Sequence, residues 1–181
     1  MSVLPITLWG DKILKEVTKK VDKVDDELIT LIRNMFETME NAKGVGLAAN
    51  QVNSSKSLFI VDLREIEEYK DTKPLVMINP EIIDSSPETV IYEEGCLSLP
   101  LLVSDVERPE WIKIKYLDPN EEERIFESDD FFSRVIQHEY DHLLGKMIPD
   151  RVDERERKRL QNQLKKIMNR DLDIPYPVTD K

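Results

Sequence analysis

The sequence predicts a single domain in which helices lie before and after a middle region of strands. The chain of 181 residues has the length of one domain and can bury a substantial core. Apolar residues with helical spacing occur near the start and over the last third, whereas short β-branched or alternating runs fill the middle. No internal repeat or low-complexity linker divides the chain, so we expect residues 1–181 to form one domain.

The composition fits a globular protein and excludes several other classes. The net charge is −11, with 40% hydrophobic and 35% charged residues, which argues against disorder and against nucleic-acid binding of a general or sequence-specific kind. No apolar run approaches the roughly 20 residues that span a bilayer, and the first ten residues lack a signal-peptide pattern, so we expect no membrane partner and a cytoplasmic location. Cys96 is the single cysteine, which excludes an internal disulfide and suggests a reducing compartment.

The first third of the chain predicts two helices. Residues 12–16 form a short one, and Asp25 or Asp26 can cap a longer one that ends near Met39. The apolar residues of the longer helix recur at intervals of three and four: Leu28, Ile29, Leu31, Ile32, Met35, Phe36 and Met39. This helix is expected to pack against the core.

The middle of the chain predicts strands. The runs are residues 58–61, 74–79, 88–92 and 111–117. The second run is expected to end at Asn79-Pro80. In the last run Ile112, Ile114 and Tyr116 alternate with lysines, as in a half-buried antiparallel strand.

A helix is predicted next, begun by Ser128 or an aspartate after it and stopped by Gly145. One stripe of this helix contains Phe131, Val135, His138 and His142. The two imidazoles project from one face about one turn apart, the separation that a single metal ion requires. They are the two histidines of the chain, and they stand in H-E-x-x-H spacing with Glu139 placed to reach a water on the metal. The alternative is a pair of surface histidines on an amphipathic helix.

A catalytic site of this kind needs a third protein ligand. A further histidine, as in the metzincins, is absent from the sequence. A thermolysin-like site would use Glu154 or Glu156, although both stand in a run of alternating charges typical of a solvated face. Cys96 lies between a glycine and an apolar residue and is the favoured candidate, with a buried core cysteine as the alternative.

The glycine-containing residues 44–51 allow backbone to approach a ligand closely, and Gln51 adds a side-chain amide. The same stretch is similar to a dinucleotide-binding fingerprint, with Asp62 downstream. That fingerprint requires a strand that enters the glycines, whereas here a helix is predicted before them. We therefore reject dinucleotide binding.

Three stretches together resemble the motifs of the peptide deformylases, in that family's order: residues 44–51 (GVGLAANQ), 93–100 (EEGCLSLP) and 137–142 (QHEYDH). Gly10, Asp11 and Leu14 extend the resemblance toward the start of the chain. It implies an α+β fold in which antiparallel β-sheets surround a central metal-binding helix, followed by a C-terminal helix. The implied activity is removal of the N-formyl group from the initiator methionine of new polypeptides in the bacterial cytoplasm.

The resemblance also implies roles for individual residues. The metal ligands fall on Cys96, His138 and His142, the general acid and base on Glu139, and the oxyanion donors on the Gln51 side chain and the Leu97 backbone N–H. Substrate contacts fall on Val45, Gly46, Gly95 and Val135, and Glu94 pairs with Arg108 behind the ligands. The implied cofactor is one divalent metal ion, Fe(II) in the cell, with Zn, Ni or Co as alternatives.

Three residues depart from the family pattern. Asn50 stands where Pro or Thr is common, and we expect little effect because its neighbour carries the functional amide. Val103 occupies a place in the expected loop after the cysteine motif where some members have Arg, so peptide contacts there are in doubt. Arg134 replaces an apolar residue near the methionine pocket, and we expect its stem to cover apolar surface while its guanidinium faces water.

The last helix has a charge opposite to that of the rest of the chain. Residues 151–170 contain 8 basic and 3 acidic side chains, whereas residues 1–150 contain 17 basic and 31 acidic ones, and residues 171–181 form a tail. A solvated face explains this pattern, but the resemblance favours weak, salt-sensitive docking on the ribosome. Deletion of everything after Pro149 is then expected to abolish docking and leave peptide hydrolysis largely intact.

Two other hypotheses for the function stay open: a general metalloprotease and a domain with a structural metal site.

Overall fold

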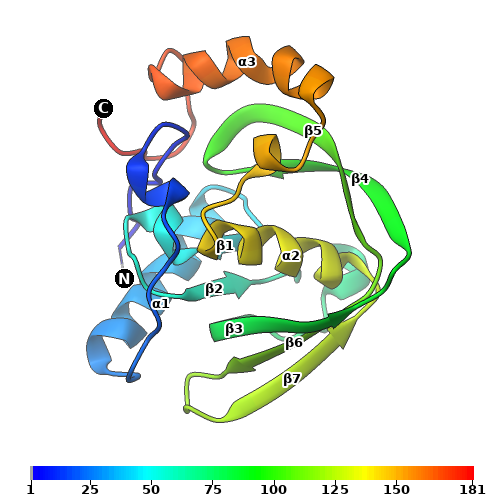
Figure 1. Cartoon of the computed structure of the whole chain (residues 1–181). Helices are drawn as coiled ribbons and strands as arrows, with labels where there is room; N and C mark the ends of the chain where they lie inside the picture. Colours follow the sequence, from blue (N-terminus) through cyan, green and yellow to red (C-terminus); the bar gives the residue numbers. More distant parts are fainter. Residues whose placement is uncertain (1) are drawn as a thin grey trace.

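A central helix, α2 (Phe131–Leu143), is enclosed by two antiparallel sheets in the computed structural model, which describes residues 2–181 (Figure 1). The sheet on one side contains, in spatial order, β1 (Gly46–Ala48), β2 (Leu58–Val61), β3 (Leu75–Ser85), β6 (Ile112–Leu117) and β7 (Glu123–Ser128). The hairpin of β4 (Thr89–Cys96) and β5 (Leu99–Pro109) curves over the other side. This arrangement confirms the predicted α+β class.

Two further helices cover the outside of this arrangement. The N-terminal α1 (Asp26–Asn41) packs against β1 and β2, and the C-terminal α3 (Glu154–Met168) packs against β5. Shorter 3-10 turns occur at Lys12–Lys15, Ala49–Val52, Glu67–Tyr69 and Ile148–Asp150. None of the helices within residues 2–181 combines the length and the apolar character that crossing a bilayer requires.

The helix ends follow the predicted capping residues. The Asp25 carboxylate accepts a hydrogen bond from the backbone N–H of Leu28 at 2.9 Å, and Asp130 caps α2 in the same way through Phe132. Gly145 follows α2 with a φ of +69°, and a Cβ there would lie 2.5 Å from the carbonyl oxygen of Lys15. Glycine is therefore required at this position both for backbone conformation and for space.

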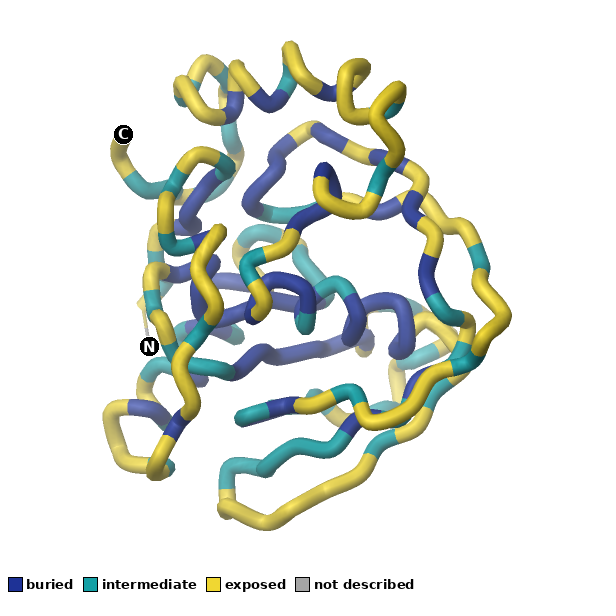
Figure 2. The backbone as a smooth tube through the Cα atoms, viewed as in Figure 1, coloured by how far each residue is buried: buried dark blue, intermediate teal, exposed yellow. Residues whose placement is uncertain are grey.

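Burial is concentrated where α2 meets the sheet. Every residue of β1 and β2 is buried, as are ten of the thirteen residues of α2 (Figure 2). The edge strand β7 contains no buried residue. Because α2 is enclosed on both sides, any polar side chain on its inner face must find partners within the protein.

Several predicted boundaries were wrong. Strand β3 continues past Asn79-Pro80 to Ser85, because the pairing with β6 shifts register between Ile78 and Glu81 and so tolerates the proline. The Asn79 side chain bonds both backbone groups of Val21, which stabilises the positive φ of 50° at this residue. The helix predicted at residues 12–16 is a single 3-10 turn.

Strands β1, β5 and β7 were not predicted, and β1 lies within the glycine-containing residues 44–51. Strand β5 alternates buried and exposed positions, but its buried face includes Ser104 and Arg108, which hide the hydrophobic alternation. Val103 therefore lies in a strand and not in a loop. Strand β7 is an exposed, charged edge strand whose sequence carries little hydrophobic signal.

Candidate active site

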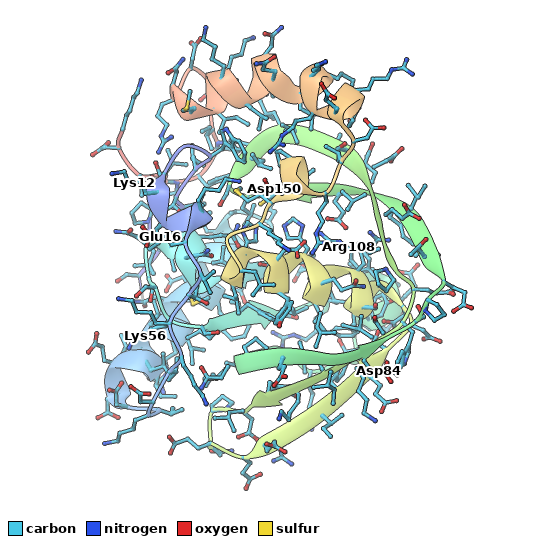
Figure 3. All side chains as sticks on the ribbon, viewed as in Figure 1. Lys12, Glu16, Lys56, Asp84, Arg108 and Asp150 are labelled. Carbon is cyan, nitrogen blue, oxygen red and sulfur yellow. The ribbon has the colours of Figure 1, made fainter. Side chains whose placement is uncertain are left out.

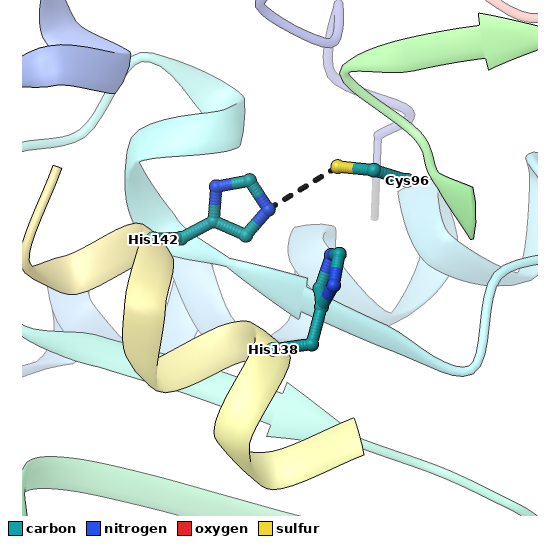
Figure 4. A group of neighbouring side chains, drawn as sticks. All are labelled: Cys96, His138 and His142. Carbon is teal, nitrogen blue, oxygen red and sulfur yellow. Dashed lines mark hydrogen bonds between the residues drawn. The ribbon is translucent and has the colours of Figure 1, made fainter. Parts of the chain in front are cut away.

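Cys96, His138 and His142 meet between the end of β4 and the inner face of α2 (Figure 4). Their donor atoms all lie within 4.8 Å of one another, and Cys96 Sγ is 3.2 Å from Nε2 of His142. The helix supplies both imidazoles from successive turns, and the hairpin supplies the thiol from a residue 42 positions earlier than His138. The structure thus brings together the three residues that the sequence proposes as metal ligands.

These donors fit a first-row divalent metal ion. A thiolate with two imidazoles suits Fe, Co, Ni or Zn, whereas Mg and Ca prefer oxygen ligands. Nδ1 of His138 lies 3.0 Å from Oε2 of Glu94, which leaves Nε2 for a metal and fixes the ring. Three protein ligands leave one coordination position for substrate or water, as catalytic sites require.

Glu139 lies on α2 between the two histidines and is almost completely buried. Burial raises the pKa of its carboxyl to about 7, although the neighbouring His138 acts in the opposite direction. Its Oε2 has no hydrogen-bond partner among residues 2–181. A carboxyl group with these properties can exchange a proton near neutral pH.

Gly46 in β1 provides the space that Glu139 occupies. A Cβ built at Gly46 would lie 2.5 Å from Oε1 and 2.9 Å from Cδ of Glu139. The buried carboxylate therefore lies directly against the backbone of β1, a contact that only glycine permits. This packing gives a physical reason for a glycine within residues 44–51.

The Gln51 amide is held in one orientation. Its Oε1 accepts a hydrogen bond from the backbone N–H of Ala48 at 2.8 Å, so Nε2 points toward the thiol. That nitrogen is 3.1 Å from Ser98 Oγ and 3.6 Å from Cys96 Sγ. Gln51 can therefore present an N–H donor beside the three candidate ligands.

Leu97 and Ser98 form the tight turn between β4 and β5. The Ser98 carbonyl accepts a hydrogen bond from the backbone N–H of Trp9 at 3.0 Å. The Leu97 carbonyl accepts one from the hydroxyl of Tyr176 at 2.8 Å. The C-terminal tail thus reaches the cysteine motif, a contact that was not predicted.

A buried network of charges surrounds Glu94 behind His138. Arg108 donates to both oxygens of Glu94, at 2.6 and 2.9 Å, and to Asp141 of α2 at 2.7 Å. Figure 3 shows Arg108 reaching from β5 toward α2. Burial alone would raise the pKa of the Glu94 carboxyl, but the hydrogen bonds from Arg108 and His138 hold it far below its usual value. Glu94 therefore stays ionised and accepts hydrogen bonds from its neighbours.

The expectation that the Arg134 guanidinium faces water was wrong. Arg134 is 5% exposed, and Nη1 donates to Oε1 of Glu94 and to the carbonyl of Val106, both at 2.9 Å. Nη2 donates to the carbonyl of Val90 at 2.8 Å. The side chain turns inward because β4 and β5 offer it a carboxylate and two carbonyls. A guanidinium that is removed from water needs such hydrogen-bond partners to offset the cost of desolvation. Arg134 therefore ties the β4–β5 hairpin to α2.

The site opens into a cavity of about 400 Å³. Its walls include the residues proposed to contact substrate: Val45, Gly46, Gly95 and Val135. Gln51, Leu97 and Glu139 line the same cavity, together with Val103 and the tail residue Tyr176. The alternative third ligands lie elsewhere, because Glu154 is exposed and pairs with Lys158, while Glu156 bonds Arg159 and Ser104.

The sequence contains a signal for the unpredicted tail contact. Four apolar residues of the tail stand at alternate positions: Leu172, Ile174, Tyr176 and Val178. All four pack against the core cluster that contains β5 and α3 residues. Such period-two spacing in a short terminal segment indicates an extended stretch packed on the domain.

Comparisons with known proteins agree with this geometry. The family model described as polypeptide deformylase matches residues 3–158. A peptide deformylase from Chlorobium phaeovibrioides is 41% identical over 97% of this chain and 92% of its own. The crystal structure of peptide deformylase from Ehrlichia chaffeensis matches with a TM-score of 0.85 and 36% identity, over 95% of this chain and 100% of that one. The structure from Thermotoga maritima matches with a TM-score of 0.78 and 40% identity, over 84% of this chain and 99% of that one. The chain therefore belongs to the polypeptide deformylase family, whose metal-dependent members remove the N-formyl group from nascent peptides.

Proposed function

We propose that the chain performs this hydrolysis with Glu139 as the group that moves the proton. When bound by Cys96, His138 and His142, a divalent metal makes a water molecule more acidic and polarises the formyl carbonyl. Glu139 takes a proton from the attacking water and returns it to the departing amine nitrogen, so that formate and a free N-terminus are released. A carboxyl pKa of about 7 supports transfer in both directions at neutral pH.

Gln51 and Leu97 are proposed to stabilise the negative oxygen that develops on the formyl carbon. Nε2 of Gln51 and the backbone N–H of Leu97 belong to residues that line the same cavity as Glu139. Donors fixed before the reaction need no reorganisation when charge develops, which makes them effective. The hydrogen bond from Ala48 to Gln51 supplies that fixation on one side.

One observation carries the proposal: Gln51, the thiol of Cys96 and the carboxyl of Glu139 face one cavity beside two imidazoles. A structural metal site would need a fourth protein ligand to close it. A general metalloprotease would cleave internal peptide bonds. Incubation with formyl-methionyl peptides and with N-blocked peptides lacking a formyl group separates the two enzymes. We expect formate from the first substrates and no chain cleavage of the second, and internal cleavage without formate would contradict the proposal.

The proposed metal in the cell is Fe(II), with Zn, Ni and Co able to occupy the same donors. The mixed set of one sulfur and two nitrogens supports this range without selecting one ion. Anaerobic reconstitution of the metal-free protein with each ion, followed by formate release and metal analysis, tests the order. We expect the iron form to be active and to lose activity in air as the thiol or the iron is oxidised.

We also propose that the basic helix α3 docks weakly on ribosomal RNA close to the emerging formylated chain, which places the enzyme in the bacterial cytoplasm. Many charges of residues 151–170 already have partners: Arg151 pairs with Asp141, Arg157 with Asp150, Lys158 with Glu154, Arg159 with Glu156 and Arg170 with Asp11. Arg155, Lys165 and Lys166 are exposed and have no ion pair within residues 2–181. They are the strongest candidates for phosphate contacts.

Deletion after Pro149 is not a clean test of docking. It would remove Leu160, Leu164 and Ile167, which are buried in the core, as well as the tail contact to Leu97. Reversal of charge at Arg155, Lys165 and Lys166 keeps these contacts. We expect this triple variant to lose low-salt co-sedimentation with ribosomes, whereas reversal at the exposed Lys19, Lys20 and Lys23 should not. Equal co-sedimentation of both variants would contradict docking through α3.

A further inference from the structure

The chain after α3 returns to the start of the domain and is fixed there. Residues 169–181 run back beside the N-terminal segment, so that both termini lie on the same side of the molecule (Figure 1). The backbone N–H of Ile6 donates to the Pro177 carbonyl at 2.9 Å, and the N–H of Thr179 donates to the Ile6 carbonyl at 3.0 Å. The tail is therefore paired through its backbone and not merely laid on the surface.

Side chains add a second attachment at Asp11. The Asp11 carboxylate accepts hydrogen bonds from Nη2 of Arg170 and from Oγ1 of Thr179, each at 2.7 Å. Arg170 and Thr179 stand at the two ends of the tail, so one carboxylate closes the segment into a loop. The residues between these anchors consequently have a defined path.

Tyr176 is the residue that this path delivers to the active site. Its hydroxyl donates to the Leu97 carbonyl at 2.8 Å, and its ring forms part of the cavity wall together with Cys96 and Glu139. Tyr176 is the single aromatic residue after residue 150, and a proline stands on each side of it. The prolines restrict the backbone on both sides of the tyrosine and so limit how far it can move.

We infer that Tyr176 is a positioning residue for the Leu97–Ser98 turn, and that the C-terminal tail is therefore part of the working active site. The turn is held at three points: the Trp9 N–H on the Ser98 carbonyl, Gln51 Nε2 on Ser98 Oγ, and the Tyr176 hydroxyl on the Leu97 carbonyl. Of these three contacts, the one from Tyr176 is made to Leu97, the residue whose N–H is the proposed oxyanion donor. The hydrogen bonds on the Leu97 and Ser98 carbonyls fix the backbone of this turn. They thereby keep the Leu97 N–H directed at one place, which oxyanion stabilisation requires.

The inference concerns a part of the chain outside the family-model match, which ends at residue 158. It rests on the proposed oxyanion role of Leu97, and that role can fail separately. Gln51→Ala probes the oxyanion site directly and should lower kcat by about 10² to 10³. Formate release by the unmodified protein probes the activity itself.

The test is Tyr176→Phe, which keeps the ring and removes only the hydroxyl. We expect kcat for a formyl-methionyl peptide to fall roughly fivefold, the change that corresponds to the loss of one hydrogen bond of about 1 kcal/mol. KM should change less than twofold, and bound metal and Tm should stay close to those of the unmodified protein. A rise in KM at constant kcat would mean that Tyr176 only forms the wall of the cavity, and would overturn the inference.

A second measurement does not depend on turnover. In ¹H–¹⁵N spectra of zinc-loaded protein, Tyr176→Phe should shift the amide resonances of Leu97 and Ser98. The matched control is Tyr116→Phe, which removes a half-buried hydroxyl in β6 and should change neither these resonances nor kcat. Unshifted Leu97 and Ser98 resonances in Tyr176→Phe, or shifted resonances with an unchanged kcat, would each overturn the positioning role.

Discussion

The two sides of the active site are built from different kinds of contact. On the α2 side, two of the three proposed ligands and the proton-transfer group come from five consecutive residues, so helical geometry alone places His138, Glu139 and His142. On the hairpin side, the Leu97–Ser98 turn depends on Trp9, Gln51 and Tyr176, which lie far apart in the sequence. The reactive groups on α2 are thus placed by local sequence, whereas the geometry of the Leu97–Ser98 turn depends on long-range contacts. Substitutions on the first side should abolish the reaction, and those on the second should weaken it or the fold.

The largest effect is expected for Cys96→Ser. A serine hydroxyl is a poor ligand for the ions that suit a thiolate with two imidazoles, so the variant should lose stoichiometric metal and nearly all activity. Peroxide should likewise inactivate the unmodified protein by oxidising the thiol. Metal analysis and formate release measure both effects. A fully active Cys96→Ser protein with one metal per chain would remove Cys96 from the metal centre.

Glu139→Gln separates metal binding from proton transfer on the α2 side. The amide keeps the size of the carboxyl and cannot accept the proton, so kcat should fall by roughly 10² or more while the metal content stays unchanged. Metal analysis should accompany the kinetics of the purified variant. Loss of metal from Glu139→Gln would instead show that this residue holds the ion.

The sequence predicted the α2 side of the site well because its information is local. The H-E-x-x-H spacing, the Asp130 cap and Gly145 each act within one or two helical turns. It failed for β5 and for Arg134, where polar residues face inward to meet partners from other elements. Hydrophobic patterns carry no signal for a buried Arg108 or Arg134, because each is compensated by a carboxylate or carbonyl that is distant in sequence.

Arg134→Met tests whether the hairpin is tied to α2 by charge. The substitution keeps the apolar stem but removes the donors to Glu94 and to two strand carbonyls, so we expect a loss of about 3 kcal/mol in the free energy of unfolding. The matched control is Arg124→Met in β7, whose ion pairs are half-exposed and should contribute little to stability. Urea unfolding of the metal-loaded proteins gives both values. Equal losses in the two variants would show that the inward orientation of Arg134 contributes nothing beyond a surface pair.

The smallest effect concerns Asp11, which closes the tail. Burial alone would raise the pKa of this carboxyl, but hydrogen bonds from Thr179, Arg170 and the Leu8 backbone hold it below the ordinary value of 3.8. A carboxyl group whose pKa is lower in the folded protein than in the unfolded chain stabilises the fold at pH values above its unfolded-state pKa. This stabilisation is lost as the pH falls through its folded-state pKa. Asp11→Asn should therefore lower the free energy of unfolding by about 1 kcal/mol at pH 7, and the difference from the unmodified protein should shrink below pH 3.8. Asp173→Asn, which changes an exposed carboxylate of the same tail, is the matched control and should have little effect at either pH. A difference for Asp11→Asn that persists unchanged down to pH 3 would mean that shape, and not the carboxylate charge, attaches the tail to the domain.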